Sequence, residues 1–297
     1  MDNPQNTVMV VGATGFLGME ICRQLISANK KVMGLVRSSS DENTVGSLKQ
    51  MGVETITGDV KDPDSLLAAF QNVTSLISTV SATRSRKDGD SLESVDEGGQ
   101  LNVVKAAKAN GIKHVVYISF NPMQAEFPLQ TAKRKVENAL RESGMTYTIL
   151  QPTFFMEVWL GPHLGFDYPN AKANIFGAGN NKIAWISLRD VAAFAVASLD
   201  NETAKNAVIE LGGPDALSPF EVVKIFEETS GKTFDIQNVP EEALRSQKDA
   251  AQDSLSKSFA CLMLSYAAGS EIDMQQTLEN FPFKLISVRD YARQVTA

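Results

Sequence analysis

The chain has 297 residues, a length that favours one large α/β unit with a smaller lobe. Its composition, 43% hydrophobic and 21% charged, is ordinary for a globular protein and excludes a low-complexity or fibrous chain. With 28 Lys and Arg against 35 Asp and Glu, the net charge of −7 argues against a nucleic-acid partner held by bulk electrostatics.

Short β-branched runs alternate with amphipathic segments through the first half of the chain. The predicted strands are TVMVV (7–11), KVMGLV (31–36), VETIT (53–57), SLISTV (75–80), HVVYIS (114–119) and TYTIL (146–150). The predicted helices between them span 16–28, 42–51, 62–70, 91–110 and 129–143. Asp62 and Pro63 are typical of a helix start. Continuous apolar strands separated by helices predict a doubly wound, parallel Rossmann sheet of the α/β class.

The pattern loosens after Pro152. The aromatic stretch 153–170 is expected to be a loop, 183–187 a short strand, 189–199 a helix with Asp190 as its N-cap, and 206–211 a strand that returns to the sheet. Ser218 and Glu221 form a predicted capping box, with Gly231 after the helix end. The remainder is expected to be mostly helical.

These patterns predict two parts. Residues 1–152 form the Rossmann domain, to which 184–212 return, and residues 153–183 with 213–297 form a smaller, mostly helical substrate lobe at the carboxyl ends of the strands. Open α/β sheets bind their ligands at those ends.

A glycine motif follows the first strand and opens the first helix. Gly12, Gly15 and Gly18 have the spacing that permits a sharp turn, a close approach of a pyrophosphate to the backbone, and tight packing of the helix. The helix N-terminus would offer its unpaired N–H groups to the phosphates. The residues expected at this dinucleotide site are Gly12, Thr14, Gly15, Phe16, Leu17 and Gly18.

Arg37 stands at the end of the second strand, where an acid would accept hydrogen bonds from a free ribose 2′-hydroxyl. A guanidinium donates to a 2′-phosphate instead, and the serines from Ser38 onward add hydroxyl donors. NADP(H) is therefore the predicted cofactor. The alternative is a solvated arginine in a turn.

Four further residues lie after the third strand or at the end of the fourth. Asp59 and Val60 are placed to meet the adenine, although Asp59 is equally suited to cap the next turn or helix. Thr79 and Val80 lie where the chain passes the pyrophosphate and nicotinamide. Arg84, in the loop that follows, either aids a phosphate or is solvated.

The segments VVGATGFLG, GDVKDPDSL, NVVKAAKANGIKHVVYIS, KRKVENALRESGMTYTILQPTFFME and WISLRDVA together resemble the NmrA-like, atypical short-chain dehydrogenase/reductase family over about residues 7–230. That family includes isoflavone-reductase-like enzymes, NADPH-dependent quinone reductases and redox-sensing regulators. The resemblance implies a Rossmann fold and NAD(P) binding.

Ordinary members of the superfamily carry a Tyr-x-x-x-Lys pair for proton transfer. Here Lys133 holds the lysine position, Leu129 stands where the tyrosine would be, and Asn121 replaces the usual serine or threonine. The resemblance makes Lys133 the candidate proton donor and ribose ligand, against the alternative of a surface lysine on a helix.

The segment after the sixth strand resembles the family segment that covers the nicotinamide. Pro152, Thr153 and Phe154 are expected to meet the cofactor. The substrate pocket is expected to include Asn121, Phe155, Met156, Trp159 and His163, although packing of these aromatic residues within the lobe is an equal alternative.

Two functions remain open. One is an NADPH-dependent reductase of a small carbonyl, quinone or conjugated alkene, which implies a small-molecule substrate. The other is a non-catalytic NADP(H)-sensing regulator or assembly factor with a protein partner. No metal-ligand spacing and no membrane-span run occur, so neither a metal nor a membrane partner is expected. Two isolated cysteines and the lack of a signal pattern favour the cytoplasm.

Overall fold

The computed structural model describes residues 6–84 and 86–297. The chain divides into two compact units, which are described separately. The first takes in the chain up to Ser119 together with Thr131–Leu150 and Ala192–Ile209. The second comprises Phe120–Gln130, Gln151–Val191 and Glu210–Ala297.

A seven-stranded sheet forms the centre of the fold, in the order β10-β6-β5-β4-β1-β2-β3. Its pairs are parallel, as where Val8 of β1 lies opposite Val32 of β2 and Ser75 of β4. The six strands predicted in the first half of the chain and the later strand that returns to them are confirmed. The strand bounds are β1 (Thr7–Val11), β2 (Lys31–Val36), β3 (Glu54–Thr57), β4 (Ser75–Ser78), β5 (His114–Ile118), β6 (Thr146–Pro152) and β10 (Ala207–Leu211).

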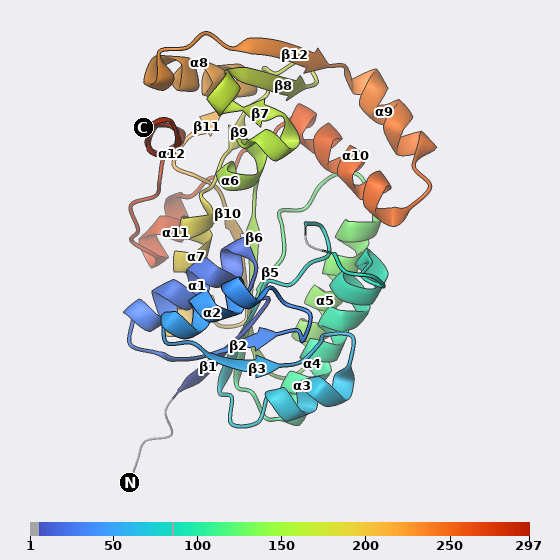
Figure 1. The fold of residues 1–297 in the computed structure, drawn as a ribbon, viewed down its shortest axis with the longest axis vertical. Coiled ribbons are helices and arrows are strands. Elements are labelled where there is room, and N and C mark those ends of the chain that lie inside the picture. The colour runs from blue at the N-terminus through green and yellow to red at the C-terminus, as the bar shows by residue number, and fades with distance from the viewer. Residues whose placement is uncertain (1–5, 85) are drawn as a thin grey trace. The chain divides into compact units, whose positions relative to one another are not determined.

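The strand order reverses between β1 and β4, and right-handed crossovers therefore place helices on both faces of the sheet. Helices α1 and α2 lie on one side, and α3, α4 and α5 lie on the other (Figure 1). Apolar side chains of the strands and of the second group of helices, including Leu76, Val103 and Leu140, form one buried core. The helices are α1 (Phe16–Ser27), α2 (Glu42–Gln50), α3 (Pro63–Ala69), η1 (Leu92–Gly99), α4 (Gln100–Ala109), α5 (Pro128–Glu142) and α7 (Leu188–Ala197).

Local capping signals fix several helix ends. Asp62 accepts hydrogen bonds from the first turn of α3, with Pro63 at its first position, as predicted. The Ser218–Glu221 capping box is present, and Gly231 ends its helix with φ +69°. The predicted helix over 91–110 begins at its cap Ser91, but its first eight residues are wound as the π-helix η1 before α4 continues it.

The second unit contains more β-structure than the sequence pattern indicates. The stretch 153–170, expected to be a loop, holds a short helix, two 3₁₀ turns and a strand. A three-stranded sheet in the order β12-β8-β7 was not expected at all. Besides η4 (Glu202–Ala204) of the first unit, the remaining elements of the described chain are α6 (Met156–Trp159), η2 (Pro162–Leu164), β7 (Phe166–Asp167), η3 (Tyr168–Asn170), β8 (Lys172–Phe176), β9 (Ile183–Ala184), β11 (Ala216–Leu217), α8 (Pro219–Ser230), β12 (Asp235–Val239), α9 (Glu241–Ala250), α10 (Ser254–Ala268), α11 (Gln275–Asn280) and α12 (Val288–Thr296).

Aromatic rings make up much of the core of the second unit. Tyr266 of α10 stacks on Trp159 with ring centroids 5.6 Å apart and meets Phe176 edge-on at 5.3 Å. The fully buried Trp185 donates its indole N–H to the Leu217 carbonyl at 2.9 Å, so the ring buries a large apolar area without an unsatisfied donor.

Asp190 has a different structural role from the one expected. Because α7 begins at Leu188, Asp190 lies inside its first turn rather than at the cap. Its carboxylate accepts a hydrogen bond from the Ile286 N–H at 2.9 Å and so ties α7 to the segment before α12. Burial raises the pKa of Asp190 to about 6.

An Asp190→Asn variant should be more stable than the wild type at pH 8, by about 2 kcal/mol, because the amide removes a buried charge and keeps an acceptor for Ile286. The folded-state pKa is raised, so the wild type loses stability relative to the variant as the pH rises from about 4 through about 6. Urea unfolding at pH 4, 6 and 8 measures this difference, and a gap that does not grow with pH would contradict the assignment.

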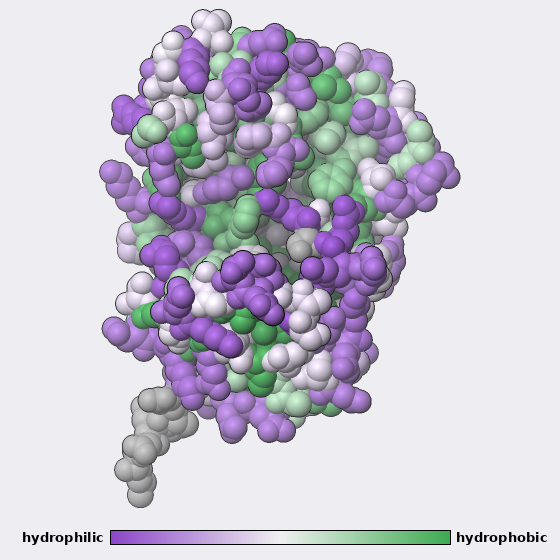
Figure 2. Space-filling view, in the orientation of Figure 1, coloured by the Kyte–Doolittle hydropathy of each residue, from purple (hydrophilic) through white to green (hydrophobic). Residues whose placement is uncertain are grey.

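Hydrophilic residues predominate on the face shown in Figure 2. Both cysteines, Cys22 and Cys261, are free and buried. In the part of the chain that the structure describes, no helix is both long enough and apolar enough to cross a bilayer.

Candidate functional site

The loop after β1 can accept only glycine at its turn. Gly12 has φ +90°, and a Cβ there would lie 2.6 Å from Thr79 Oγ1 and 3.0 Å from the Val80 nitrogen. The Gly15 N–H donates to the Gly12 carbonyl at 3.0 Å and closes the turn. The structure thus brings Thr79 and Val80, which directly follow β4, against the glycine loop.

The start of α1 is open to an anion. A Cβ on Gly18 would lie 2.1 Å from the Gly12 carbonyl oxygen, so the glycine lets the first turn of the helix pack on the loop. Gly15 precedes the helix and supplies no capping side chain, and the first turn carries no acidic residue. The N–H groups and the positive end of the helix dipole are therefore available to phosphate oxygens.

Phe16, on the first turn of α1, is 61% exposed, while Thr14 and Leu17 are half-buried. The guanidinium of Arg84 lies 4.1 Å from the centroid of the Phe16 ring. This cation–π contact places a positive charge from the β4–η1 loop beside the glycine loop.

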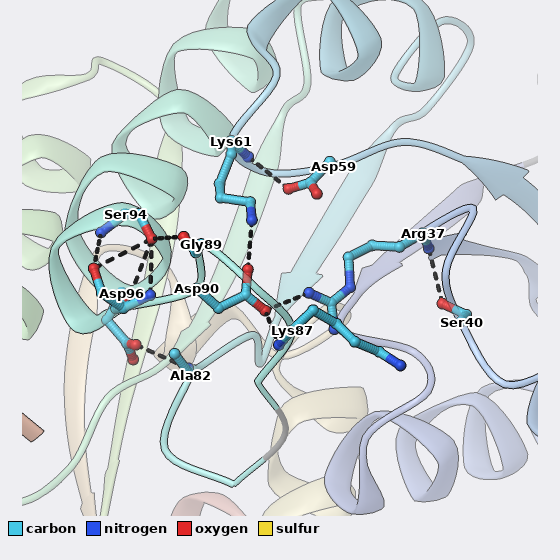
Figure 3. A network of polar contacts seen from close by, with 11 residues as sticks. Arg37, Ser40, Asp59, Lys61, Ala82, Lys87, Gly89, Asp90, Ser94 and Asp96 are labelled. Carbon is cyan, nitrogen blue, oxygen red and sulfur yellow. Dashed lines mark hydrogen bonds and ion pairs between the residues drawn. The ribbon is translucent and has the colours of Figure 1, made fainter.

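Arg37 is held by a carboxylate that the sequence did not point to. Its Nη1 donates to Asp90 Oδ2 at 2.6 Å, and Lys61 Nζ donates to Asp90 Oδ1 at 2.5 Å (Figure 3). The Asp90 side chain is 1% exposed, whereas those of Arg37 and Lys61 keep 29% and 28% of their surface. Burial opposes ionisation of Asp90, but hydrogen bonds from Lys61, the Lys87 amide and Arg37 lower its pKa to about 2.

The neighbours of Arg37 share its turn. Ser40 Oγ accepts from the Arg37 N–H at 2.9 Å, whereas Ser38 is exposed. Asp59 Oδ1 accepts from the Lys61 N–H at 2.9 Å, which is the turn-capping alternative considered for it, and Val60 is buried.

Lys133 lies in the interior of the first unit, which excludes the surface-lysine alternative. It is 6% exposed, its Nζ donates to the Ile118 carbonyl at 3.1 Å, and the same atom lies 5.0 Å from the centroid of the Tyr117 ring. Burial lowers the pKa of Lys133, and the charges of Asp96 and Glu137 partly oppose this shift.

Buried polar groups surround this lysine. Asp96 of η1 is fully buried, and burial raises its pKa while the Lys133 charge opposes the shift. Its Oδ2 accepts from the Ala82 N–H at 2.9 Å. Among the described residues, Asp96 Oδ1 and the Tyr117 hydroxyl are the buried side-chain atoms without a hydrogen-bond partner. Such atoms are costly in a packed core, and they mark the neighbourhood of Lys133 as polar.

Leu129 is buried on the same helix, with its N–H donating to Ser258 Oγ at 3.1 Å, and so no hydroxyl occupies the position of the missing tyrosine. Asn121 donates its side-chain N–H to Glu210 Oε1 at 3.0 Å. The buried His114 forms a hydrogen bond through Nε2 with Thr148 Oγ1 at 2.9 Å within the sheet.

The residues expected near the nicotinamide lie in the second unit. Thr153 donates its N–H to the Leu211 carbonyl at 2.9 Å and its hydroxyl to the Ala184 carbonyl at 2.5 Å. Phe154 meets Trp159 edge-on at 4.9 Å. Pro152, Phe154 and Met156 are buried, Phe155 and Trp159 are half-buried, and His163 is exposed.

Sequence reasoning missed Asp90, Lys61, Asp96 and Tyr117. Asp90 lies 53 residues from Arg37 and 29 from Lys61, so no local spacing joins them. The available signal was weak: two acids, Asp88 and Asp90, in a loop otherwise rich in arginine and lysine, with nothing to tell them apart.

The fold and this site define a Rossmann-like α/β protein of the kind that binds a dinucleotide. The model of the NmrA-like family matches residues 4–291, and the chain belongs to that family. The resemblance inferred over about 7–230 is thereby confirmed and extends through most of the C-terminal segment.

Relatives with different functions match this chain. Photosystem II assembly factor Ycf39 of Synechocystis sp. is 32% identical over 244 residues, which cover 80% of this chain and 72% of the relative. NAD(P)H azoreductase of Xenophilus azovorans is 30% identical over 230 residues, covering 76% and 74%. The crystal structure of Citrobacter sp. triphenylmethane reductase complexed with NADP(H) has a TM-score of 0.79 and 22% identity, covering 98% of this chain and 100% of that one.

Proposed function

We propose that this protein is an NADPH-dependent reductase of a small carbonyl, quinone or conjugated alkene. The observation that carries the proposal is Lys133, a lysine buried in the unit that also holds the uncapped glycine loop. Reductases among the relatives, such as the azoreductase, support it.

The residues of the first unit fit NADP(H) in three places. Gly12, Gly15 and Gly18 form a cradle that a Cβ would fill, and the N-terminus of α1 would receive the pyrophosphate. Arg37 would bind the 2′-phosphate. Asp59 and Val60 would meet the adenine, and Thr79 and Val80 would lie along the pyrophosphate and nicotinamide.

Bound NADPH would supply a hydride. Lys133 would hold the nicotinamide ribose and give a proton from Nζ to the substrate atom that gains negative charge, so that substrate reduction consumes one hydride and one proton. Its lowered pKa favours release of that proton. Pro152, Thr153 and Phe154 are the residues proposed to meet the carboxamide, and Asn121, Phe155, Met156, Trp159 and His163 are those proposed for the substrate.

An Arg37→Ala variant should bind NADPH more weakly by about 1.5–3 kcal/mol, with NADH binding nearly unchanged, because only NADPH carries the 2′-phosphate. Calorimetric titrations with both nucleotides measure the difference. Lys31→Ala is a matched control, since Lys31 is an exposed cation at the opposite end of β2. Equal losses for NADPH and NADH would contradict the role of Arg37.

The second candidate is a non-catalytic NADP(H)-sensing assembly factor that binds a protein partner. The identity of 32% to Ycf39 and the leucine in place of the catalytic tyrosine favour it. Calorimetry with NADPH and NADP⁺, followed by an acceptor screen that monitors NADPH oxidation, separates the two candidates. Turnover supports the reductase, whereas tighter NADP⁺ binding without turnover supports the sensor.

A further inference from the structure

The Asp90 carboxylate binds both Arg37, the residue proposed for the 2′-phosphate, and the neighbouring Lys61. Its carboxylate points between Lys61 and Arg37, with one oxygen on each (Figure 3). Oδ2 also accepts from the Lys87 N–H at 2.9 Å. Both oxygens are therefore used, and the donors Arg37 Nη1 and Lys61 Nζ are directed at Asp90 rather than at solvent.

The backbone fixes this carboxylate in place. The Asp90 N–H donates to the Lys87 carbonyl at 2.9 Å, which closes a turn through Gly89 at φ +79°. Ser94 Oγ, at the start of η1, donates to the Gly89 carbonyl at 3.0 Å and holds the turn against the helix. The position of Asp90 is thus built into the loop that precedes η1 and does not depend on the two cations alone.

A phosphomonoester needs the same donors. It carries a charge of about −1.5 to −2 at pH 7 and three acceptor oxygens, and it would favour a guanidinium and an ammonium side by side. Asp90 already provides one negative charge to that pair, so the three side chains together carry a net charge of +1 instead of +2.

We propose that Asp90 is a specificity-determining residue, an internal carboxylate that occupies Arg37 and Lys61 and gives them up when a 2′-phosphate binds. The inference rests on the proposed NADP(H) function. It adds to that function a free-energy cost for binding the 2′-phosphate. Affinity for the 2′-phosphorylated nucleotide is reduced by the work of displacing Asp90, while a nucleotide without that phosphate leaves the ion pairs in place. Asp90 therefore makes the difference in affinity between NADPH and NADH smaller than it would be without this carboxylate.

The experiment compares Asp90→Asn with wild type in the full-length chain. Calorimetry with NADPH, NADH, adenosine 2′,5′-bisphosphate and 5′-AMP should show NADPH and the bisphosphate binding about tenfold more tightly to the variant. NADH and 5′-AMP should change less than about twofold. Asp88→Asn is the matched control, because Asp88 is an exposed acid in the same loop, and it should change none of the four.

Two further measurements make the test independent of how well the variant folds. In an Arg37→Ala background, Asp90→Asn should increase the affinity for NADPH much less, because the Asp90 carboxylate and the 2′-phosphate compete for the Arg37 guanidinium. In a crystal structure of the wild-type NADPH complex, Asp90 should have left Arg37 Nη1.

An unchanged or weaker affinity of Asp90→Asn for NADPH, or a carboxylate still bonded to Arg37 in that complex, overturns the inference and makes Asp90 a brace for the arginine. This failure is distinct from that of the proposed function. If neither the wild type nor Asp90→Asn binds NADPH or the bisphosphate, both the role of Asp90 and the proposed NADP(H) function are contradicted.

Discussion

Replacing Lys133 with methionine should lower the rate of NADPH oxidation by about 10²–10⁴-fold, the usual contribution of a positioned acid. Methionine keeps the length of the stem and removes the ammonium, and the site is already buried, so the fold should be retained. Because burial lowers the pKa of Lys133, its positive charge is disfavoured in the folded state, and the fold does not depend on it. Steady-state kinetics with an acceptor from the screen measure the effect, which should fall mainly on kcat.

Lys135→Met is the matched control on the same helix. The Lys135 side chain is 52% exposed and pairs with Glu97 at 2.7 Å on the surface, so its loss should leave the rate within about twofold. A Lys133→Met variant that reduces the acceptor at the wild-type rate would assign the proton to water. The glycine loop and Arg37 would then still hold the nucleotide, but the reductase would lose its proposed acid.

The Asp96 carboxylate favours the protonated form of Lys133, although the lysine is buried. The Asp96 charge raises the pKa of Lys133 against the effect of burial, and Lys133 lowers the pKa of Asp96 in the same way. The two groups form a coupled pair in which a proton lost by one is more easily taken up by the other. Asp96 also holds the Ala82 N–H, so the loop that carries Asp90 is fixed near both of its ends by carboxylates.

The large sheet could be predicted because its strands are buried on both faces and read as continuous apolar runs. β1 and β5 are buried along their whole length. The small sheet could not be predicted, because β12 reads DIQNV and four of its five residues are exposed. It is specified by backbone pairing with β8, from Asp235 opposite Lys172 to Val239 opposite Phe176, and such pairing leaves no alternation in the sequence.

The candidate site divides in the same way. The glycine loop lies within seven residues of chain, and its spacing alone predicts the turn that the structure shows. Lys133 was found through the family resemblance, and only the structure shows that it is buried. The Asp90 contacts join three loops that follow different strands, so they arise from the strand order and not from any local pattern.

A Gly18→Ala variant should lose about 2–4 kcal/mol of folding free energy and bind NADPH about 100-fold more weakly or worse. The added Cβ would lie 2.1 Å from the Gly12 carbonyl oxygen and 2.9 Å from the Ala13 Cα, both backbone atoms that no rotamer change can move aside. The first turn of α1 must then lift away from the loop, and its N–H groups lose their alignment on the phosphates. Urea unfolding and calorimetry with NADPH measure the two losses.

Gly46→Ala is the control for Gly18→Ala, because the same substitution should have the opposite effect on stability there. Gly46 lies inside α2, and a Cβ there meets nothing within 4 Å. Alanine should therefore stabilise the protein by about 0.5–1 kcal/mol through its helix propensity and leave NADPH binding unchanged. If Gly18→Ala also stabilises the protein, or keeps its affinity for NADPH, the close approach of α1 to the loop is not what binds the pyrophosphate. A loss confined to Gly18→Ala locates nucleotide binding at the contact between the first turn of α1 and the glycine loop.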